Sequence, residues 1–263
     1  MEFPRTTIRI AGNRPIQLSV IDTGPPEAQG TIIMIHGAGG DANQWKHQIS
    51  SLSGRYRVIA PDLRGHGQSE IPRSAYSLEE FLWDFAQILE QLRVVEPFVL
   101  MAHSFGGPIA LTFAAAQPRQ IRRLILIATA PEMHLSPFYE TMLRLPLPVD
   151  QLERLRPVLF PRLHAPPLFV LKRVLAGTLF PWRGWDLLPQ VQVPTLIIGG
   201  QFDFIVPTAT LQRMAELMPN AHFELVRYTG HLPHLERPES VNRHIEAFLN
   251  EKRRSWRGDH EQV

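Results

Sequence analysis

No cysteine occurs among the 263 residues of the chain. Disulfide bonds, thiolate catalysis and cysteine metal sites are therefore excluded, and any covalent chemistry must use another nucleophile. Long apolar runs are missing as well, because no segment approaches the roughly 20 residues that span a bilayer. The N-terminal residues, Met-Glu-Phe-Pro-Arg-Thr, lack the apolar core of a secretory signal. We therefore expect a cytoplasmic protein with no membrane span.

A large charge of one sign is also lacking. Lysine and arginine number 27 and aspartate and glutamate 25, which gives a formal net charge of +2. The basic residues cluster only at 252–257, which we expect to be a solvated C-terminal end. The composition therefore predicts no nucleic-acid partner. The histidines lack metal-ligand spacing, so we expect neither a metal nor another cofactor.

Apolar segments typical of strands alternate with amphipathic patterns typical of helices. Several strand segments are continuous apolar runs, as in Thr-Ile-Ile-Met-Ile at 31–35, which is typical of strands covered on both faces. This order predicts an α/β fold with a mostly parallel eight-stranded sheet, helices on both faces and ligands at its carboxyl edge. We expect strands at 6–10, 16–21, 31–35, 56–60, 98–101, 124–127, 195–198 and 222–226, and helices at 77–92, 108–116, 207–218 and 238–249.

Residues 131–188 interrupt this alternation. The segment is rich in proline and aromatic residues, contains no clear strand, and is longer than a plain crossover requires. We expect a small helical cap inserted after the sixth strand, within a core formed by 1–130 and 189–263. The alternative is an irregular, helix-rich surface excursion with no role in binding.

The most informative motif surrounds Ser104. Residues 102–107, Ala-His-Ser-Phe-Gly-Gly, follow the apolar run 98–101 and precede a helical pattern. A serine between a buried strand and a helix, flanked by small residues, is typical of a nucleophile elbow, in which the turn exposes the hydroxyl. Ala102 occupies a position where the usual pattern has glycine, so we expect a slightly strained turn.

Two further residues match this serine in chain order. Asp203 follows the predicted strand at 195–198, and His231 follows the last predicted strand. An aspartate that orients a histidine, which in turn accepts the serine proton, is the arrangement that activates a serine nucleophile. Asp203 could instead cap a helix, with Glu132 as the acid. His234 is the alternative base; otherwise we expect it to line the mouth of the site or to form a local hydrogen bond.

A glycine-rich turn at 36–40, His-Gly-Ala-Gly-Gly, follows the predicted strand at 31–35. Backbone N–H groups in such a turn can stabilise an oxyanion, and we expect Ala38 and Phe105 to supply the two donors. A phosphate-binding loop is not favoured, because Gly-Lys-Ser/Thr and dinucleotide spacing are absent. His36 and His103 are expected to support the loops beneath the site.

Together these motifs resemble the α/β-hydrolases of the capped esterase type, and the resemblance covers nearly the whole length. The matching motifs are His36-Gly37-x-Gly39, the 62–69 stretch Asp-Leu-Arg-Gly-His-Gly-Gln-Ser, the Ser104 turn, Gly199-x-x-x-Asp203 with Val206-Pro207, and Gly230-His231 with Glu236-x-Pro238. The resemblance implies a structural role for Asp62, Arg64 and His66. Similar dehalogenases and epoxide hydrolases carry aspartate at the elbow, whereas serine favours attack on acyl carbon.

The sequence therefore predicts a serine hydrolase that cleaves carboxylic esters with an apolar acyl or alcohol part through an acyl-enzyme. Its partner would be a small molecule with an apolar portion. The alternatives are a carbon–carbon bond hydrolase using Arg144 or Arg183 on a substrate carboxylate, a lactonase, a perhydrolase, or a non-catalytic binding protein. Candidate pocket side chains are Trp45, Phe105, Met133, His134, Phe138, Tyr139, Met142, Trp182 and Trp185.

Overall fold

The computed structural model describes residues 2–12, 15–133 and 166–251. Its centre is an eight-stranded sheet with the strand order β1-β2-β4-β3-β5-β6-β7-β8. The pairs β1–β2 and β2–β4 are antiparallel and all others are parallel, which confirms the predicted fold class. The strands are β1 (Arg5–Ile10), β2 (Ile16–Thr23), β3 (Thr31–Ile35), β4 (Arg57–Pro61), β5 (Phe98–His103), β6 (Ile121–Ile127), β7 (Thr195–Gly200) and β8 (Ala221–Val226).

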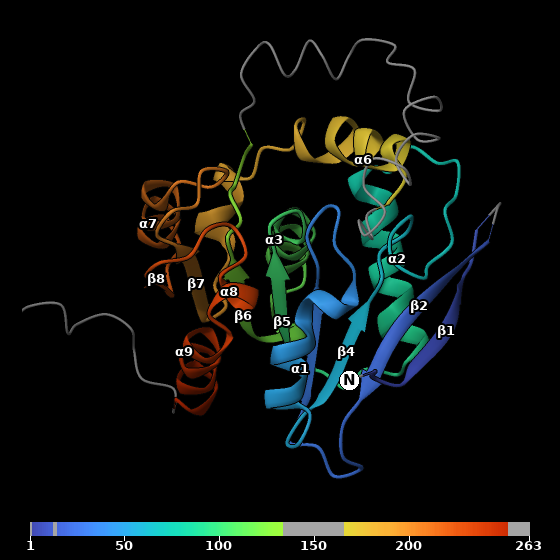
Figure 1. Cartoon of the computed structure of the whole chain (residues 1–263), viewed down its shortest axis with the longest axis horizontal. Coiled ribbons are helices and arrows are strands. Elements are labelled where there is room, and N and C mark those ends of the chain that lie inside the picture. Colours follow the sequence, from blue (N-terminus) through green and yellow to red (C-terminus); the bar gives the residue numbers. More distant parts are fainter. Residues whose placement is uncertain (1, 13–14, 134–165, 252–263) are drawn as a thin grey trace, which may run out of the picture.

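Helices cover both faces of this sheet (Figure 1). Because side chains alternate along a strand, Ile33 and Ile35 of β3 enter one core, whereas Ile32 and Met34 enter the other. The first core is completed by α2 (Leu78–Gln91), α3 (Gly106–Ala116) and α7 (Thr208–Leu217), and the second by α1 (Lys46–Leu52) and α9 (Pro238–Asn250). Both faces of the central strands are therefore buried, as their continuous apolar sequences predict.

The helix boundaries follow local capping chemistry. Ser77 caps α2, its hydroxyl accepting from the Glu80 N–H while the Glu80 carboxylate accepts from the Ser77 N–H, so the two residues form a capping box. Helix α3 begins at Gly106, two residues before the predicted start, because Phe105 already has helical dihedral angles. Shorter elements were not predicted: η1 (Ala42–Trp45), α1, η2 (Pro118–Gln120) and α8 (Pro233–Glu236).

The insertion between β6 and β7 is described only at its two ends. Its second part contains α6 (Leu168–Val174), η3 (Leu175–Leu179) and η4 (Trp185–Gln190). Figure 1 shows α6 beyond the carboxyl ends of the parallel strands. At the base of the insertion Glu132 bridges to Arg183 in both backbone and side chain, with 3.5 Å between the charged atoms. Residues 134–165 lie outside the described part, so the division into a core and a complete cap stays a prediction.

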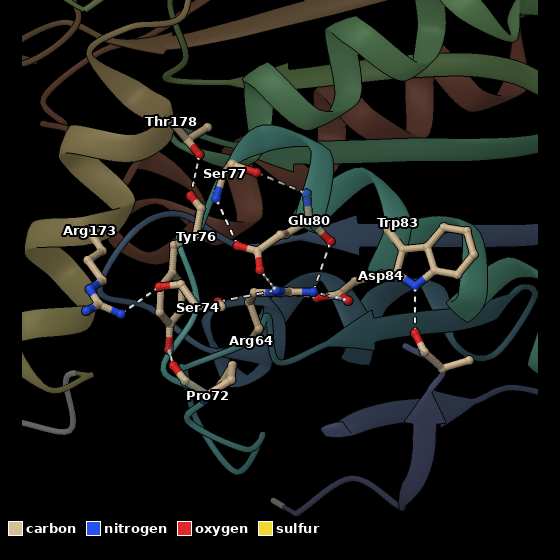
Figure 2. A network of polar contacts seen from close by, with 11 residues as sticks. Arg64, Pro72, Ser74, Tyr76, Ser77, Glu80, Trp83, Asp84, Arg173 and Thr178 are labelled. Atoms are coloured by element: carbon tan, nitrogen blue, oxygen red, sulfur yellow. Dashed lines mark hydrogen bonds and ion pairs between the residues drawn. The ribbon is translucent and has the colours of Figure 1, made fainter. Parts of the chain in front are cut away.

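A polar network, buried at Arg64 and Asp84, joins α6 and η3 to the core (Figure 2). Arg64 donates to both carboxylate oxygens of Asp84, at 2.7 and 2.6 Å, and pairs with Glu80 at 2.8 Å. The adjoining loop accepts from the insertion, because Arg173 donates to the Ser74 carbonyl and Thr178 to the Tyr76 carbonyl, each at 2.6 Å. These contacts agree with the scaffolding role expected of Arg64.

Asp62 supports the same region. Its carboxylate accepts from the Ala42 N–H at 2.7 Å, from the Gln68 N–H at 2.8 Å and from the Arg5 guanidinium at 2.8 Å. The loop before α2 is thereby tied to β1 and η1. Within the described ranges, no helix combines the length and the apolar character needed to cross a membrane.

Candidate active site

Ser104 occupies a strained turn between β5 and α3. Its φ is +48°, a left-handed conformation that side chains with a Cβ rarely adopt. Three hydrogen bonds maintain it: the Ser104 N–H donates to the Ile127 carbonyl at 3.0 Å, and the Ser104 carbonyl accepts from the Gly107 N–H at 2.8 Å and the Thr129 hydroxyl at 2.7 Å. Ala102, where we expected the strain to originate, is fully buried within β5. The positive φ, and with it the strain of the turn, lies at Ser104.

Gly107 is required by this packing. A Cβ at this position would lie 1.8 Å from the Thr129 hydroxyl oxygen, the same oxygen that donates to the Ser104 carbonyl. Any larger residue would displace Thr129 and remove one of the bonds that hold the turn. The second glycine of Ser-x-Gly-Gly thus has a steric cause in the contact with Thr129 after β6, and the first in the contact with the end of β3, where a Cβ on Gly106 would lie 2.7 Å from the Ile35 carbonyl oxygen.

The structure brings Ser104, His231 and Asp203 together from three separate loops. The Ser104 hydroxyl oxygen lies 2.9 Å from His231 Nε2, and His231 Nδ1 lies 2.9 Å from Asp203 Oδ2. A carboxylate only accepts, so Nδ1 carries the imidazole proton and Nε2 presents a lone pair to the serine hydroxyl. The geometry can transfer a proton from Ser104 to His231.

The Asp203 carboxylate is held in place by the backbone of its own loop. Its side chain is fully buried, and Oδ1 accepts from the backbone N–H groups of Ile205 and Val206, each at 2.9 Å. Oδ2 is left for His231. Glu132, the alternative acid, pairs instead with Arg183 at the base of the insertion.

Two backbone N–H groups near Ser104 make no hydrogen bond to another described residue. In the part of the chain that is described, neither the Ala38 nor the Phe105 N–H has a hydrogen-bond acceptor. The turn that carries Ala38 is held by its neighbours, since the Gly37 N–H donates to the Gln44 side chain at 3.1 Å and the Gly40 N–H to the Gly37 carbonyl at 3.1 Å. Phe105 is the N-cap of α3, where N–H groups have no partner within the helix.

The side chains of Trp45 and His234 do not line the site, and that prediction is wrong. Both are fully buried, and their rings pack together with centroids 4.9 Å apart. The reason is that η1 and α8 meet in the core, where the Gln48 side chain also donates to the His234 carbonyl at 3.1 Å. The expected local hydrogen bond of the His234 ring is absent too, because neither ring nitrogen has a partner among the described residues.

The other pocket candidates are dispersed. The Phe105 side chain is core, packing edge-on against Phe81 with centroids 5.0 Å apart. Trp182 is buried, and Met133 and Trp185 are half-buried against the first core. His134, Phe138, Tyr139, Met142 and Arg144 lie outside the described residues.

Four histidines in the described ranges are buried, and burial lowers the pKa of each. The pKa of His36 falls to about 4 and those of His66 and His234 to about 3, while the pKa of His103 lies well below its usual range. These rings are therefore neutral near pH 7. His36 donates to the Gly37 carbonyl at 2.8 Å and accepts from the Leu63 N–H at 3.0 Å, so it joins two loops as expected.

Glu236 is a site residue whose role the sequence did not reveal. Its carboxylate accepts from the Gly230 N–H at 2.8 Å and from the Leu232 N–H at 3.1 Å. These two groups flank His231, so Glu236 fixes the backbone of the loop that carries the histidine. The only sequence signal was its place in the Glu-x-Pro motif, which gives no contact.

Comparison with known proteins identifies the family. A family model described as "alpha/beta hydrolase fold" matches residues 30–168. The chain belongs to the α/β-hydrolase family. A second model, described as "TAP-like protein", matches residues 183–259 of this α/β-hydrolase.

Individual relatives of this α/β-hydrolase include several hydrolases. A thermophilic esterase from Thermogutta terrifontis is 30% identical with a TM-score of 0.75, over 94% of this chain and 98% of that one. A meta-cleavage product hydrolase from Pseudomonas fluorescens IP01 is 25% identical with a TM-score of 0.73, over 93% and 97%. The Homo sapiens protein ABHD8 is 29% identical over 94% of this chain, which spans only 60% of that relative's length.

Proposed function

We propose that this α/β-hydrolase is a serine hydrolase of carboxylic esters with an apolar acyl or alcohol part. The observation that carries the proposal is the continuous relay Ser104–His231–Asp203, in which both links measure 2.9 Å. The similarity to the Thermogutta terrifontis esterase supports the ester class.

In the proposed reaction the Ser104 oxygen attacks the ester carbonyl carbon while His231 Nε2 accepts the hydroxyl proton. The carbonyl oxygen becomes an oxyanion, which the N–H groups of Ala38 and Phe105 stabilise. Each such donor is worth about 10²- to 10³-fold in kcat. The intermediate collapses when the bond to the alcohol oxygen breaks and the alcohol takes the proton from His231.

Water completes the cycle. It attacks the carbonyl carbon of the acyl-serine and gives one proton to His231 Nε2. The serine oxygen then leaves with that proton, and the free carboxylic acid is released. Asp203 stabilises the imidazolium that forms in each half of the reaction, and no external oxidant or cofactor is needed to balance either step.

The apolar preference is supported by apolar side chains at the described ends of the insertion, whose helix α6 lies beyond the carboxyl ends of the parallel strands. Met133, Phe169 and Leu175 are partly buried hydrophobic side chains packed against the first core. A substrate methylene that replaces water against such a surface contributes about 0.8 kcal/mol, or roughly a fourfold gain in kcat/KM.

The test is a series of p-nitrophenyl esters of graded chain length, assayed with the wild type, Ser104→Ala and Ser50→Ala. Removing the nucleophile should lower kcat by about 10⁶-fold. Ser50 is exposed and donates only to its own helix, so its variant should keep full activity. An organophosphonate should label Ser104 alone. Retention of more than about a tenth of the activity in Ser104→Ala would exclude the mechanism.

A carbon–carbon bond hydrolase is the second candidate, because of the similarity to the meta-cleavage product hydrolase. Of the two arginines considered for substrate carboxylate binding, Arg183 pairs with Glu132 and also donates to the Phe180 and Trp182 carbonyls. Arg183 therefore already has other partners, and Arg144 lies outside the described residues. A dienone acid and a lactone in the same assay distinguish the three reactions by their relative kcat/KM.

A further inference from the structure

The imidazole of His103 lies behind the relay and contacts the loop that carries the base. His103 is the last residue of β5, directly before Ser104, and is only 2% exposed. Its Nε2 lies 2.9 Å from the backbone carbonyl oxygen of His231. A carbonyl oxygen only accepts, so Nε2 must carry the proton and donate it. Burial lowers the pKa of His103, which keeps the ring neutral with its single N–H in this bond.

The opposite edge of the same ring meets the glycine-rich turn. A Cβ built on Gly37 would lie 2.6 Å from His103 Nδ1 and 3.1 Å from its Cε1. The ring therefore occupies the space beside the backbone of Gly37, one residue before the Ala38 donor. One imidazole thus contacts the turn with Ala38 and the loop with His231, while its own backbone leads into Ser104.

The loop that carries His231 is also attached to the loop of Asp203, because the Phe202 N–H donates to the Thr229 carbonyl at 2.8 Å, but that bond does not reach the strand of Ser104. Glu236 holds the N–H groups on either side, but Glu236 belongs to the same segment and does not connect it to Ser104. Asp203 holds the His231 side chain. Within the described residues, the hydrogen bond from the His103 ring is the one that ties the backbone of the base loop to the strand of the nucleophile.

We propose that His103 is a positioning residue that sets the spacing between Ser104, His231 and the Ala38 turn. The inference deepens the proposed function and rests on it. A displacement of about 1 Å between reacting groups costs roughly 10²-fold in rate, whereas substrate binding depends little on that distance. Loss of the bond should therefore lower kcat much more than it raises KM.

The test compares His103→Gln with His103→Met in the full-length protein. Glutamine places an amide N–H at the same bond separation from Cα as Nε2 of histidine, and methionine fills a similar volume without a donor. We expect His103→Met to lower kcat about 10²-fold per folded molecule, with KM changed less than threefold. His103→Gln should recover at least tenfold of that loss. Circular dichroism and thermal unfolding give the folded fraction of each variant.

A merely structural role predicts a different result, in which the two variants lose activity equally and only in proportion to their folded fractions. That outcome, or a kcat of His103→Met within threefold of wild type, would overturn the proposal. Gly37→Ala changes the same spacing while keeping the histidine: its methyl would lie 2.6 Å from His103 Nδ1 and 3.2 Å from Ser104 Cβ, so kcat should fall as well. Gly54→Ala is its control, since a Cβ there meets nothing within 4 Å.

Ser104→Ala in the same assay distinguishes failure of the proposed function from failure of the positioning role of His103. If ester turnover survives in Ser104→Ala, the proposed function fails and the positioning role fails with it. If turnover depends on Ser104 but does not distinguish methionine from glutamine at 103, only the positioning role is refuted.

Discussion

Replacing His234 by leucine should remove part of the acid sensitivity of this fold. The ring is fully buried against Trp45, and neither of its nitrogens has a partner among the described residues. Burial, followed by the nearby His231 and His47, lowers the pKa of His234 from 6.5 to about 3. The folded protein therefore keeps this ring neutral at pH values where the unfolded chain protonates it.

The sign and size of the effect follow from proton linkage. Below pH 6.5 the unfolded state binds a proton that the folded state does not, so the free energy of unfolding falls as the pH falls. The loss approaches about 1.4 kcal/mol per pH unit for each such histidine until the folded-state pKa is reached. For His234 this amounts to about 1.3 kcal/mol between pH 7.5 and 5.5. His36 and His66 contribute in the same direction in both proteins and cancel in the comparison.

Urea unfolding of the wild type and His234→Leu at both pH values measures the difference. The stability of the variant relative to wild type should increase by about 1.3 kcal/mol on going from pH 7.5 to 5.5. The value at pH 7.5 serves as the internal control, because it contains the packing change alone. Leucine removes no hydrogen bond of the ring, so this baseline difference should be small. The same difference at both pH values would refute the argument that burial keeps His234 neutral.

Two other substitutions test the packing around the site. Arg64→Met should lower the free energy of unfolding by about 3–5 kcal/mol, because it leaves the buried Asp84 carboxylate without its guanidinium partner, and Arg64→Met with Asp84→Leu should restore most of that loss in urea unfolding. No recovery in the double variant would contradict the ion-pair explanation. Gly107→Ala should destabilise by about 1–3 kcal/mol, because its Cβ would lie only 1.8 Å from the Thr129 hydroxyl oxygen, and an unchanged thermal midpoint would show that the turn can relax.

The strands and the relay residues could be predicted because their signals are local. Residues 32–35 are apolar at every position, which is typical of a strand buried on both faces. Ser104 and Asp203 follow such strands, His231 follows the edge strand β8, and the carboxyl ends of parallel strands share one edge of the sheet. Their proximity therefore follows from the order of elements alone.

Trp45 and His234 could not be placed in the same way, because their environment depends on contacts between distant segments. Gln48 donates to the His234 carbonyl across 186 positions of the chain. From the sequence, His234 is simply a polar residue three positions after His231. Its burial follows from the packing of α8 against η1, and neither short element has a periodic pattern that predicts it.

The 62–69 motif gains a second role from the structure. Besides supporting the core, this loop packs directly against the insertion. A Cβ on Gly65 would lie 2.7 Å from both the Tyr76 ring and Val170 of α6. Gly65 has a φ of +76°, so both its conformation and its space exclude a side chain. Arg64 holds this loop through its ion pairs with Asp84 and Glu80, and Thr178 of η3 donates a hydrogen bond to the Tyr76 carbonyl (Figure 2). The position of α6 relative to the sheet edge is thus determined by residues that are remote from Ser104 in sequence. A substitution in this loop should therefore move the insertion and alter substrate preference while the contacts between Ser104, His231 and Asp203 stay unchanged.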